Sequence, residues 1–479
     1  MCHNEFEVIL ETVGWLSILP PIIAIILAIW TKQVFISLFF GIWLGWSILA
    51  HGNPISGLAA ALESCIRVFE DGGNTKVIAF SAMVGALIAF TQRSGGVNGF
   101  IQWILGKGFV KDRRSAGLLA WIIGVVIFVE SSITCLVTGA VSRPIFDKLK
   151  ISREKLAYIC DSTSAPICIL IPLNGWGAYV MGLLAAQNVD TPFFTLLKSL
   201  PFNLYAIFAL VTVLVVILTG KDFGPMAKAE KRAREEGKVL RDGAEPLVST
   251  EIIAIATKEN VRPKAKNMLI PIAVMVFMMP IGLLITGHGD IMKGSGSTSV
   301  FWAVLAAITL AGNLYMIQGI LNLREVVDLF LKGIGGLMPL ALLMMLAFAI
   351  GSTCKELGTG PYVANLAKAW LSPSLVPTIL FLVSCFIAFS TGTSWGTFAI
   401  MIPIGIPMIA LMGANLYTTI GAILSGGIFG DHCSPISDTT IISSMASASD
   451  HIDHVRTQLP YALVAAATAL IIYLIISVF

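Results

Sequence analysis

Four short polar segments interrupt long apolar stretches of this sequence, at Val129–Thr134, Asp161–Pro166, Ser390–Thr397 and Gly430–Thr440. They contain carboxylates and many hydroxyls but no lysine or arginine. Carbonyl, hydroxyl and carboxylate oxygens suit a hard cation such as Na⁺, and a carboxylate also accepts a proton. Non-helical backbone at membrane depth persists only where protein or a wet cavity satisfies it, so these segments predict a buried ion site.

The carboxylates in these segments are Glu130, Asp161, Asp431 and Asp438. A carboxylate at membrane depth without a basic partner is costly, so its default interpretation is functional. The alternative is that it caps a half-helix, which fits Asp161 and Asp431, each a few residues before a proline, better than Asp438. We expect Asp438 first, and Asp161 second, to bind Na⁺ or a proton. Glu130 is the weakest candidate of the four.

The predicted ion- or substrate-binding residues share oxygen or nitrogen ligands and a place in or beside the polar segments. They are Glu130, Ser131, Ser132, Asp161, Ser162, Ser164, Asn174, Thr391, Thr393, Ser394, Asp431, His432, Ser434, Ser437, Asp438 and Thr439, with Asp161 and Asp438 as the Na⁺ ligands. His432 is equally compatible with a proton relay and with a structural role. Asp450, His451, Asp453 and His454 are expected to form a solvated cap before the last span.

One motif favours an enzyme, because Gly392–Gly396 matches the Gly-x-Ser-x-Gly nucleophile elbow around Ser394. That elbow requires a strand before the serine. An apolar membrane segment precedes Ser394 instead, so we expect no hydrolase and no enzyme. The cysteines form no Cys-x-x-Cys pair, and no cofactor other than a transported or coupling Na⁺ is expected.

The elements that carry these segments are expected to be membrane helices. Hydrophobic residues make up 56% of the 479 residues and charged residues only 12%, about half the charge of a soluble domain. Several apolar runs reach spanning length. No basic patch is interleaved with aromatics, which excludes nucleic acid as a partner. The residues before Gly14 include no lysine or arginine, so the first apolar segment is expected to be a retained span and not a signal peptide.

The chain divides into two similar halves, 1–220 and 268–479, around a charged linker at 221–267 that is expected to be cytoplasmic. Each half has a hairpin, at 115–147 and 376–412, followed by a broken helix, at 156–183 and 416–445. The segment Leu119–Phe128 aligns without gaps with Leu380–Phe389. This order predicts two repeats, each with five spans and a re-entrant hairpin.

Charge placement predicts that the repeats are inverted. Lys107, Arg113 and neighbouring bases precede the first hairpin and Lys148–Lys155 follows it, so both of its ends are expected in the cytoplasm. The stretch Ser115–Pro144 has 30 residues, too few for two full spans of about 20. The second hairpin is flanked by uncharged segments, so we expect it to enter from outside.

The run GDHCSPISDTTIISS at Gly430–Ser444 resembles the signature of the NhaC-type Na⁺/H⁺ antiporter family. Tyr158–Pro172 and Gly392–Thr397 are also similar to that family's pattern. The resemblance implies inverted repeats, a homodimer, and elevator movement of a transport domain against a scaffold. Carried over by position, it implies a site made by Thr393, Ser394, Asp431, Ser434, Ser437, Asp438 and Thr439, with Asp161 and Ser164 as counterparts. The charged linker at 221–267 is not matched to any part of that family's pattern.

Two transport functions are compatible with these residues. Na⁺/H⁺ exchange is favoured by acids without bases. The alternative is Na⁺- or H⁺-coupled transport of an amino acid or small organic acid, for which Asn174, Trp176 and Trp395 could line a larger cavity. In either case the chain is expected to be a multi-pass protein of a prokaryotic inner membrane.

Overall fold

The computed structural model describes residues 13–31, 33–105, 110–128, 130–246, 257–258, 261–368 and 371–478. Expectations for residues before Val13, for Lys107, for Val129 and for linker residues 247–256 and 259–260 lie outside the described residues.

The described part of the chain is helical, apart from one isolated bridge between Pro246 and Asp450. The helices of the first half are α2 (Leu19–Thr31), α3 (Val34–Leu49), α4 (Pro54–Arg67), α5 (Gly72–Arg93), α6 (Gly96–Leu105), α7 (Arg113–Val126), α8 (Ser131–Lys148), α9 (Arg153–Ser162), α10 (Ala165–Leu170), α11 (Gly175–Ala186), α12 (Pro192–Ser199), α13 (Leu204–Thr219) and α14 (Gly224–Glu236). Those of the second half are α15 (Lys266–Thr286), α16 (Gly296–Ile317), α17 (Leu323–Glu356), α18 (Thr359–Lys368), α19 (Val376–Thr391), α20 (Ser394–Met412), α21 (Leu416–Cys433), α22 (Asp438–Ser447) and α23 (His451–Val478). Short 3₁₀ turns are η1 (Gly14–Ile18), η2 (Val68–Glu70), η3 (Leu200–Phe202), η4 (Ile291–Lys293) and η5 (Pro373–Leu375).

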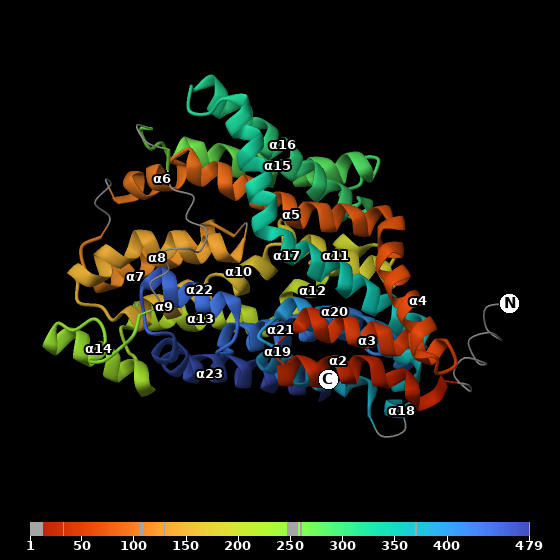
Figure 1. The fold of residues 1–479 in the computed structure, drawn as a ribbon. Coiled ribbons are helices and arrows are strands. Elements are labelled where there is room, and N and C mark those ends of the chain that lie inside the picture. Colours follow the sequence, from red (N-terminus) through yellow and green to blue (C-terminus); the bar gives the residue numbers. More distant parts are fainter. Residues whose placement is uncertain are drawn as a thin grey trace.

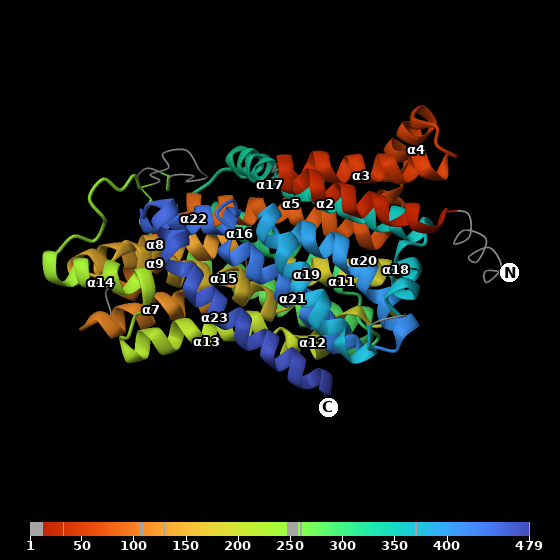
Figure 2. The same ribbon diagram turned by 90° about the horizontal axis from the view of Figure 1, so that it is seen from below.

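Eight described helices are long and apolar enough to cross a membrane, and a bent pair, Arg153–Leu170 with Gly175–Ala186, could make a ninth span. The expectation of an all-α polytopic membrane protein is therefore confirmed. Many helices run side by side in one direction, with α14 at one end of the molecule and α4 and α18 at the other (Figure 1). The view from below shows the same two ends (Figure 2).

Each expected hairpin is a pair of packed helices, α7 with α8 and α19 with α20. Glu130 caps the N-terminus of α8, because its carboxylate accepts the backbone N–H of Ile133 at 2.9 Å. At the second tip, Gly392 ends α19 with φ of 68°, a left-handed conformation that glycine adopts without strain. Thr393 then caps α20. Whether the two hairpins are re-entrant and related by inversion stays a prediction.

Both expected breaks are present in the helices that follow the hairpins. The helix α9 ends at Ser162 and α10 begins at Ala165, with Pro166 in its first turn. The helix α21 ends at Cys433, and Ser434–Ser437 separates it from α22. Proline lacks the N–H that would continue the preceding helix, which explains why each break coincides with one.

The helix α21 lies unusually close to the second hairpin because glycines face it. A Cβ at Gly430 would lie 2.2 Å from the backbone nitrogen of Phe389, and one at Gly426 would lie 2.4 Å from the carbonyl oxygen of Phe381. Small residues spaced four apart allow such backbone contact between membrane helices. The broken helix α21 and the arm α19 therefore approach to backbone distance at these points, with only the small side chains of Ser384 and Ala388 beside the two glycines.

The charged linker is partly helical and packs against the first half. Glu230 of α14 forms an ion pair of 2.5 Å with Arg113, and Arg232 forms one of 2.9 Å with Glu154. Lys155 is paired with Asp222 at 2.7 Å. The linker and the basic ends of α7 and α9 therefore lie at one end of the molecule, and the side of the membrane that they face stays a prediction.

Candidate functional site

Asp431 lies at the centre of a cluster of hydroxyls. Its Oδ2 accepts a hydrogen bond of 2.7 Å from Ser394, at the tip of the second hairpin. Its Oδ1 accepts one of 2.6 Å from Ser437 and one of 3.5 Å from Thr439, beyond the break in α21. Asp431 is 1% exposed. The tip of one hairpin and the break of the neighbouring helix are thus joined through one carboxylate.

Asp161 and Asp431 occupy similar positions in the two broken helices. Asp161 is the next-to-last residue of α9, and Asp431 lies two residues before the end of α21. Neither caps a helix N-terminus, so the capping alternative does not apply to them. The C-terminal end of a helix carries a partial negative charge. A buried carboxylate added there makes a strongly negative site, and such a site favours a cation.

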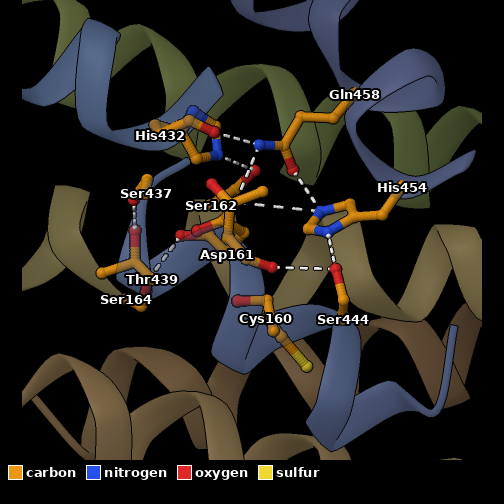
Figure 3. Close-up of polar contacts among 12 residues, drawn as sticks. Cys160, Asp161, Ser162, Ser164, His432, Ser437, Thr439, Ser444, His454 and Gln458 are labelled. Atoms are coloured by element: carbon orange, nitrogen blue, oxygen red, sulfur yellow. Dashed lines mark hydrogen bonds and ion pairs between the residues drawn. The ribbon is translucent and has the colours of Figure 1, made fainter. Parts of the chain in front are cut away.

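Asp161 belongs to a second polar network, which includes α23 (Figure 3). Its Oδ2 accepts a hydrogen bond of 2.8 Å from Gln458, and Nε2 of His454 lies 3.8 Å away. Its Oδ1 is buried and has no hydrogen-bond partner among the described protein atoms. Buried polar oxygens are normally satisfied by protein, water or an ion. Asp161 therefore has one oxygen free to bind a cation or a proton.

The network continues from Asp161 toward the end of α22. His454 Nε2 is 2.8 Å from Oε1 of Gln458, and its Nδ1 is 2.8 Å from Oγ of Ser444. Ser444 in turn lies 3.1 Å from Nδ1 of His451, which is partly exposed. A continuous chain of hydrogen-bonding groups thus links the buried Asp161 to a residue that is partly exposed at the surface.

The other two acids are placed differently. Glu130 is used as the cap of α8, and its Oε1 also accepts from Ser131 and Ser132 at 3.3 and 3.1 Å. Asp438 opens α22, where it is exposed and accepts the N–H of Thr439 at 2.9 Å. Asp438 lies within electrostatic range of both Asp431 and Glu130. The favoured Na⁺ ligand of the sequence analysis therefore lies beside the hydroxyl cluster, and Asp431 lies within it.

His432 has both ring nitrogens engaged. Nε2 is 3.0 Å from Oγ of Ser162 and Nδ1 is 2.6 Å from the hydroxyl of Tyr205. His432 is 1% exposed. This geometry supports the structural interpretation of His432, which joins α9, α13 and α21.

Several predicted hydroxyls bond to backbone and not to a carboxylate. Ser164 donates to the carbonyl of Asp161 at 2.7 Å, and Ser434 donates to that of Phe389 at 2.7 Å. Thr391 donates to the carbonyl of Ile387 one turn earlier. These residues hold the tip and the breaks in place, with their hydroxyl lone pairs still available.

Asn174 connects the first hairpin with the elements behind it. Its side-chain nitrogen donates to the carbonyls of Phe128 and Cys168 at 2.9 and 2.8 Å, and its oxygen caps α11. The rings of Trp176 and Trp395 lie 4.5 Å apart between centroids. Trp176 is 2% exposed and Asn174 is fully buried. In this conformation Asn174 therefore holds the first hairpin and α11 in place, and Trp176 packs against Trp395. Neither residue lines an open cavity.

The expected solvated cap before the last span is wrong for His454. Asp450 does cap α23, since it accepts the N–H groups of Ile452 and Asp453. His454 is instead fully buried and faces Asp161. The sequence analysis also missed Gln458 and Tyr205. The spacing His451, His454, Gln458 places all three on one face of a helix, which is the signal that could have identified them.

Three comparisons with known proteins bear on this geometry. Residues 191–478 match the sequence profile of the Na⁺/H⁺ antiporter family. The chain is 33% identical to an uncharacterized protein of Haemophilus influenzae over 96% of this chain and 90% of that protein. It is 32% identical to the malate-2H⁺/Na⁺-lactate antiporter of Bacillus subtilis over 28% of this chain and 29% of that one. The crystal structure of the Alcanivorax borkumensis YdaH transporter has the same fold, with a TM-score of 0.57, 14% identity, and coverage of 87% of this chain and 88% of that one.

Proposed function

This chain belongs to the Na⁺/H⁺ antiporter family, and from that premise we propose that it exchanges Na⁺ for H⁺ at the two buried aspartates. It is a secondary transporter of the membrane and not an enzyme. Ser394 follows the helix α19 and not a strand, which agrees with the rejection of a hydrolase elbow.

The observation that carries the proposal is the hydroxyl cluster around Asp431. Ser394, Ser437 and Thr439 now donate their hydrogens to the carboxylate. When Na⁺ binds there, the same hydroxyls can rotate and present lone pairs, since a hydroxyl is both donor and acceptor. A proton on the carboxylate removes the charge that holds Na⁺. One site then holds Na⁺ or H⁺ alternately, as exchange requires.

Asp161 is proposed as the counterpart in the first half, with its unpartnered Oδ1 as the second titrating position. Asp438 is proposed as an entrance residue, which raises the local cation concentration beside Asp431 without forming the cluster. This assignment moves the principal role from Asp438, as expected from sequence, to Asp431.

Alternating access is proposed to follow the elevator scheme, in a homodimer of a prokaryotic inner membrane. Side-chain hydrogen bonds already join the second tip to α21 and, through His432, α21 to α9. In Figure 1 the pair α7–α8 lies toward the α14 end and the pair α19–α20 toward the α18 end. This placement supports inverted repeats whose hairpins enter from opposite sides.

The experiment is a Na⁺ pulse on proteoliposomes that contain a trapped pH indicator. Wild-type protein should move protons out against entering Na⁺, and Asp431→Asn should abolish this movement while its elution profile and melting temperature stay close to wild type. Asp328→Asn, at an exposed carboxylate of α17, is the matched control and should exchange normally. Normal Na⁺-driven proton movement by folded Asp431→Asn protein would refute the proposed site.

A second candidate function is exchange that includes a small organic acid. A cavity of about 580 Å³ lies between α4, α11 and α17, and Arg67, Asp71, Lys293 and Lys355 are among its lining residues. Its volume falls within the range of about 300–1,000 Å³ typical of small-molecule sites. The helix α11 runs from Asn174 beside the hairpins to Gln187 in this cavity. Uptake of labelled malate or lactate driven by a Na⁺ gradient, absent without Na⁺, would favour this candidate.

A further inference from the structure

A basic cavity lies away from the ion site, at the end of the molecule where α14 packs. It has a volume of about 260 Å³ and lies between α7, α9, α13 and α14. Four cationic side chains line it, Arg113, Arg114, Lys155 and Arg234, against a single lining carboxylate, Glu230.

Two of these cations are already neutralised. Arg113 is paired with Glu230 and also donates to the carbonyls of Leu149 and Lys150 at 3.1 and 2.5 Å. Lys155 is paired with Asp222 at 2.7 Å and lies 3.7 Å from Glu230. The one carboxylate in the cavity is thus fully engaged.

The other two cations leave an excess of positive charge. Arg114 and Arg234 are exposed, and within the described residues neither makes an ion pair or a side-chain hydrogen bond. Asp112, two positions before Arg114, has its carboxylate occupied as the cap of α7. Guanidinium groups bind phosphate oxygens in pairs of parallel hydrogen bonds. An anion with several oxygens fits this cavity.

The walls of the cavity indicate where that anion comes from. Phe146, Ile159 and Ile217 form an apolar back wall. On α13, Val211, Val215 and Leu218 are 48%, 50% and 49% exposed and form one stripe that ends just before Thr219 and Gly220, which line the cavity. A stripe of exposed aliphatic side chains on a membrane helix faces acyl chains. A phosphate at the end of that stripe is therefore more simply a lipid headgroup than a free ion.

We propose that this cavity binds the phosphate group of an anionic membrane phospholipid, with Arg114 and Arg234 as its ligands and the stripe on α13 as the path of its acyl chains. Basic pockets between membrane helices at the cytoplasmic surface are suited to anionic headgroups. The bound lipid bridges α7, α13 and the linker helix α14. The site does not depend on which ion the protein transports.

The test uses the full chain, purified in detergent and stripped of lipid, with phosphatidylglycerol as the probe. Wild-type protein should gain about 3 °C in Tm with saturating phosphatidylglycerol and much less with phosphatidylcholine. Arg114→Gln/Arg234→Gln should lose most of this gain, and native mass spectrometry should show one bound phosphatidylglycerol fewer. The matched control, Lys228→Gln/Lys231→Gln, removes the same charge from exposed positions on α14 and should keep the gain.

Three results would overturn the proposal. The first is an equal phosphatidylglycerol shift in the double arginine variant and in wild type. The second is an equal loss in the lysine control, which means that only net charge matters. The third is a full shift with inorganic phosphate alone, which identifies a free-anion site. If the double glutamine variant does not fold, Arg114→Lys and Arg234→Lys singly keep the charge, and each should reduce the shift by weakening bidentate contact.

Discussion

Ser394 and Asp431, 37 positions apart in the chain, are joined by a hydrogen bond of 2.7 Å between the hydroxyl Oγ and the carboxylate Oδ2. This bond joins the tip of the second hairpin to the end of the broken helix α21. Its two partners come from segments that neighbour each other only in the folded protein, and it locates the proposed ion site between them.

Ser394→Ala should weaken Na⁺ binding without removing transport. One oxygen ligand of several is lost from the Na⁺ shell, and a loss of about 1.4 kcal/mol in binding free energy corresponds to a tenfold weaker affinity. The half-saturating Na⁺ concentration in proteoliposomes should therefore rise about tenfold or more. Ser374→Ala, at an exposed serine, is the control. Covalent labelling of Ser394 by a fluorophosphonate would contradict the transporter assignment of this residue.

Asp438→Asn should keep proton exchange but require more Na⁺. Asp438 is exposed and accepts only the N–H of Thr439 in the described structure, and asparagine can accept the same bond. The variant loses the negative charge beside Asp431, so Na⁺ should bind more weakly while maximal exchange remains. The measurement is the Na⁺ dependence of proton movement in proteoliposomes, with Asp438→Asn and Asp431→Asn compared in parallel. Complete loss of exchange in folded Asp438→Asn protein would return the principal role to Asp438.

Gln458→Leu should destabilise the protein. Gln458 is fully buried and donates to Asp161 and to the carbonyl of His432, and it also contacts His454. Each buried polar group left without a partner costs about 1–3 kcal/mol, so we expect a clear fall in Tm in detergent. Gln33→Leu, at an exposed glutamine, should leave Tm nearly unchanged. An unchanged Tm for Gln458→Leu would show that water replaces the amide without cost.

Contact between the linker and Asp450 should be lost at low pH. Burial opposes ionisation of Asp450, but backbone N–H groups of Glu245, Asp453 and Ile452 and the charge of Arg241 outweigh it and hold its pKa below the ordinary value. A folded-state pKa that is lowered contributes stability above the unfolded value of about 3.9 and loses it as pH falls through the folded value. The amide of Glu245, which donates to Asp450 at 3.0 Å, should therefore be protected from hydrogen exchange near neutral pH and lose protection below pH about 3.9.

Asp450→Asn should reduce that protection already at neutral pH, because a neutral amide oxygen accepts a weaker hydrogen bond than a carboxylate and Arg241 loses one of its two acidic partners. Asp290→Asn should not. Equal protection of Glu245 in wild type and Asp450→Asn across the whole pH range would show that Asp453 alone holds the linker.

Single cysteines placed in a cysteine-free chain should report the topology. Lys148→Cys should react with an impermeant reagent only from the cytoplasmic side, and Ser374→Cys only from outside, because basic loops flank the first hairpin and uncharged loops the second. Both positions are exposed. Reaction of both from the same side would exclude inverted repeats.

The sequence predicted the helical class, and its four polar segments lie where α7, α9, α19 and α21 end, because proline, glycine and hydroxyl clusters stand out in apolar runs. The sequence could not show which of the acids lies within the hydroxyl cluster. Whether Asp431 or Asp438 meets Ser394 depends on which residue of the Ser434–Ser437 connection turns inward, and no periodicity applies to a non-helical connection. Glu130 gave no sign that its side chain folds back onto Ile133 as a cap.

Gln458 and His454 escaped prediction for a different reason. They lie on the last helix, outside every polar segment, and meet Asp161 only because α23 packs against α9. The packing of the linker helix α14 could not be predicted from its charged sequence. Its ion pairs with Arg113 and Glu154 join segments that are distant in the chain.

The glycine face of α21 has a mechanical consequence. Where Gly426 and Gly430 touch the backbone of α19, the neighbouring side chains are those of Ser384 and Ala388, so no long flexible side chain separates the two helices. Two helices that interlock at backbone distance resist sliding along each other. Any conformational change that carries Asp431 toward the opposite face of the membrane must therefore move α19 and α21 together as one rigid unit. The interface that slides must lie elsewhere in the molecule.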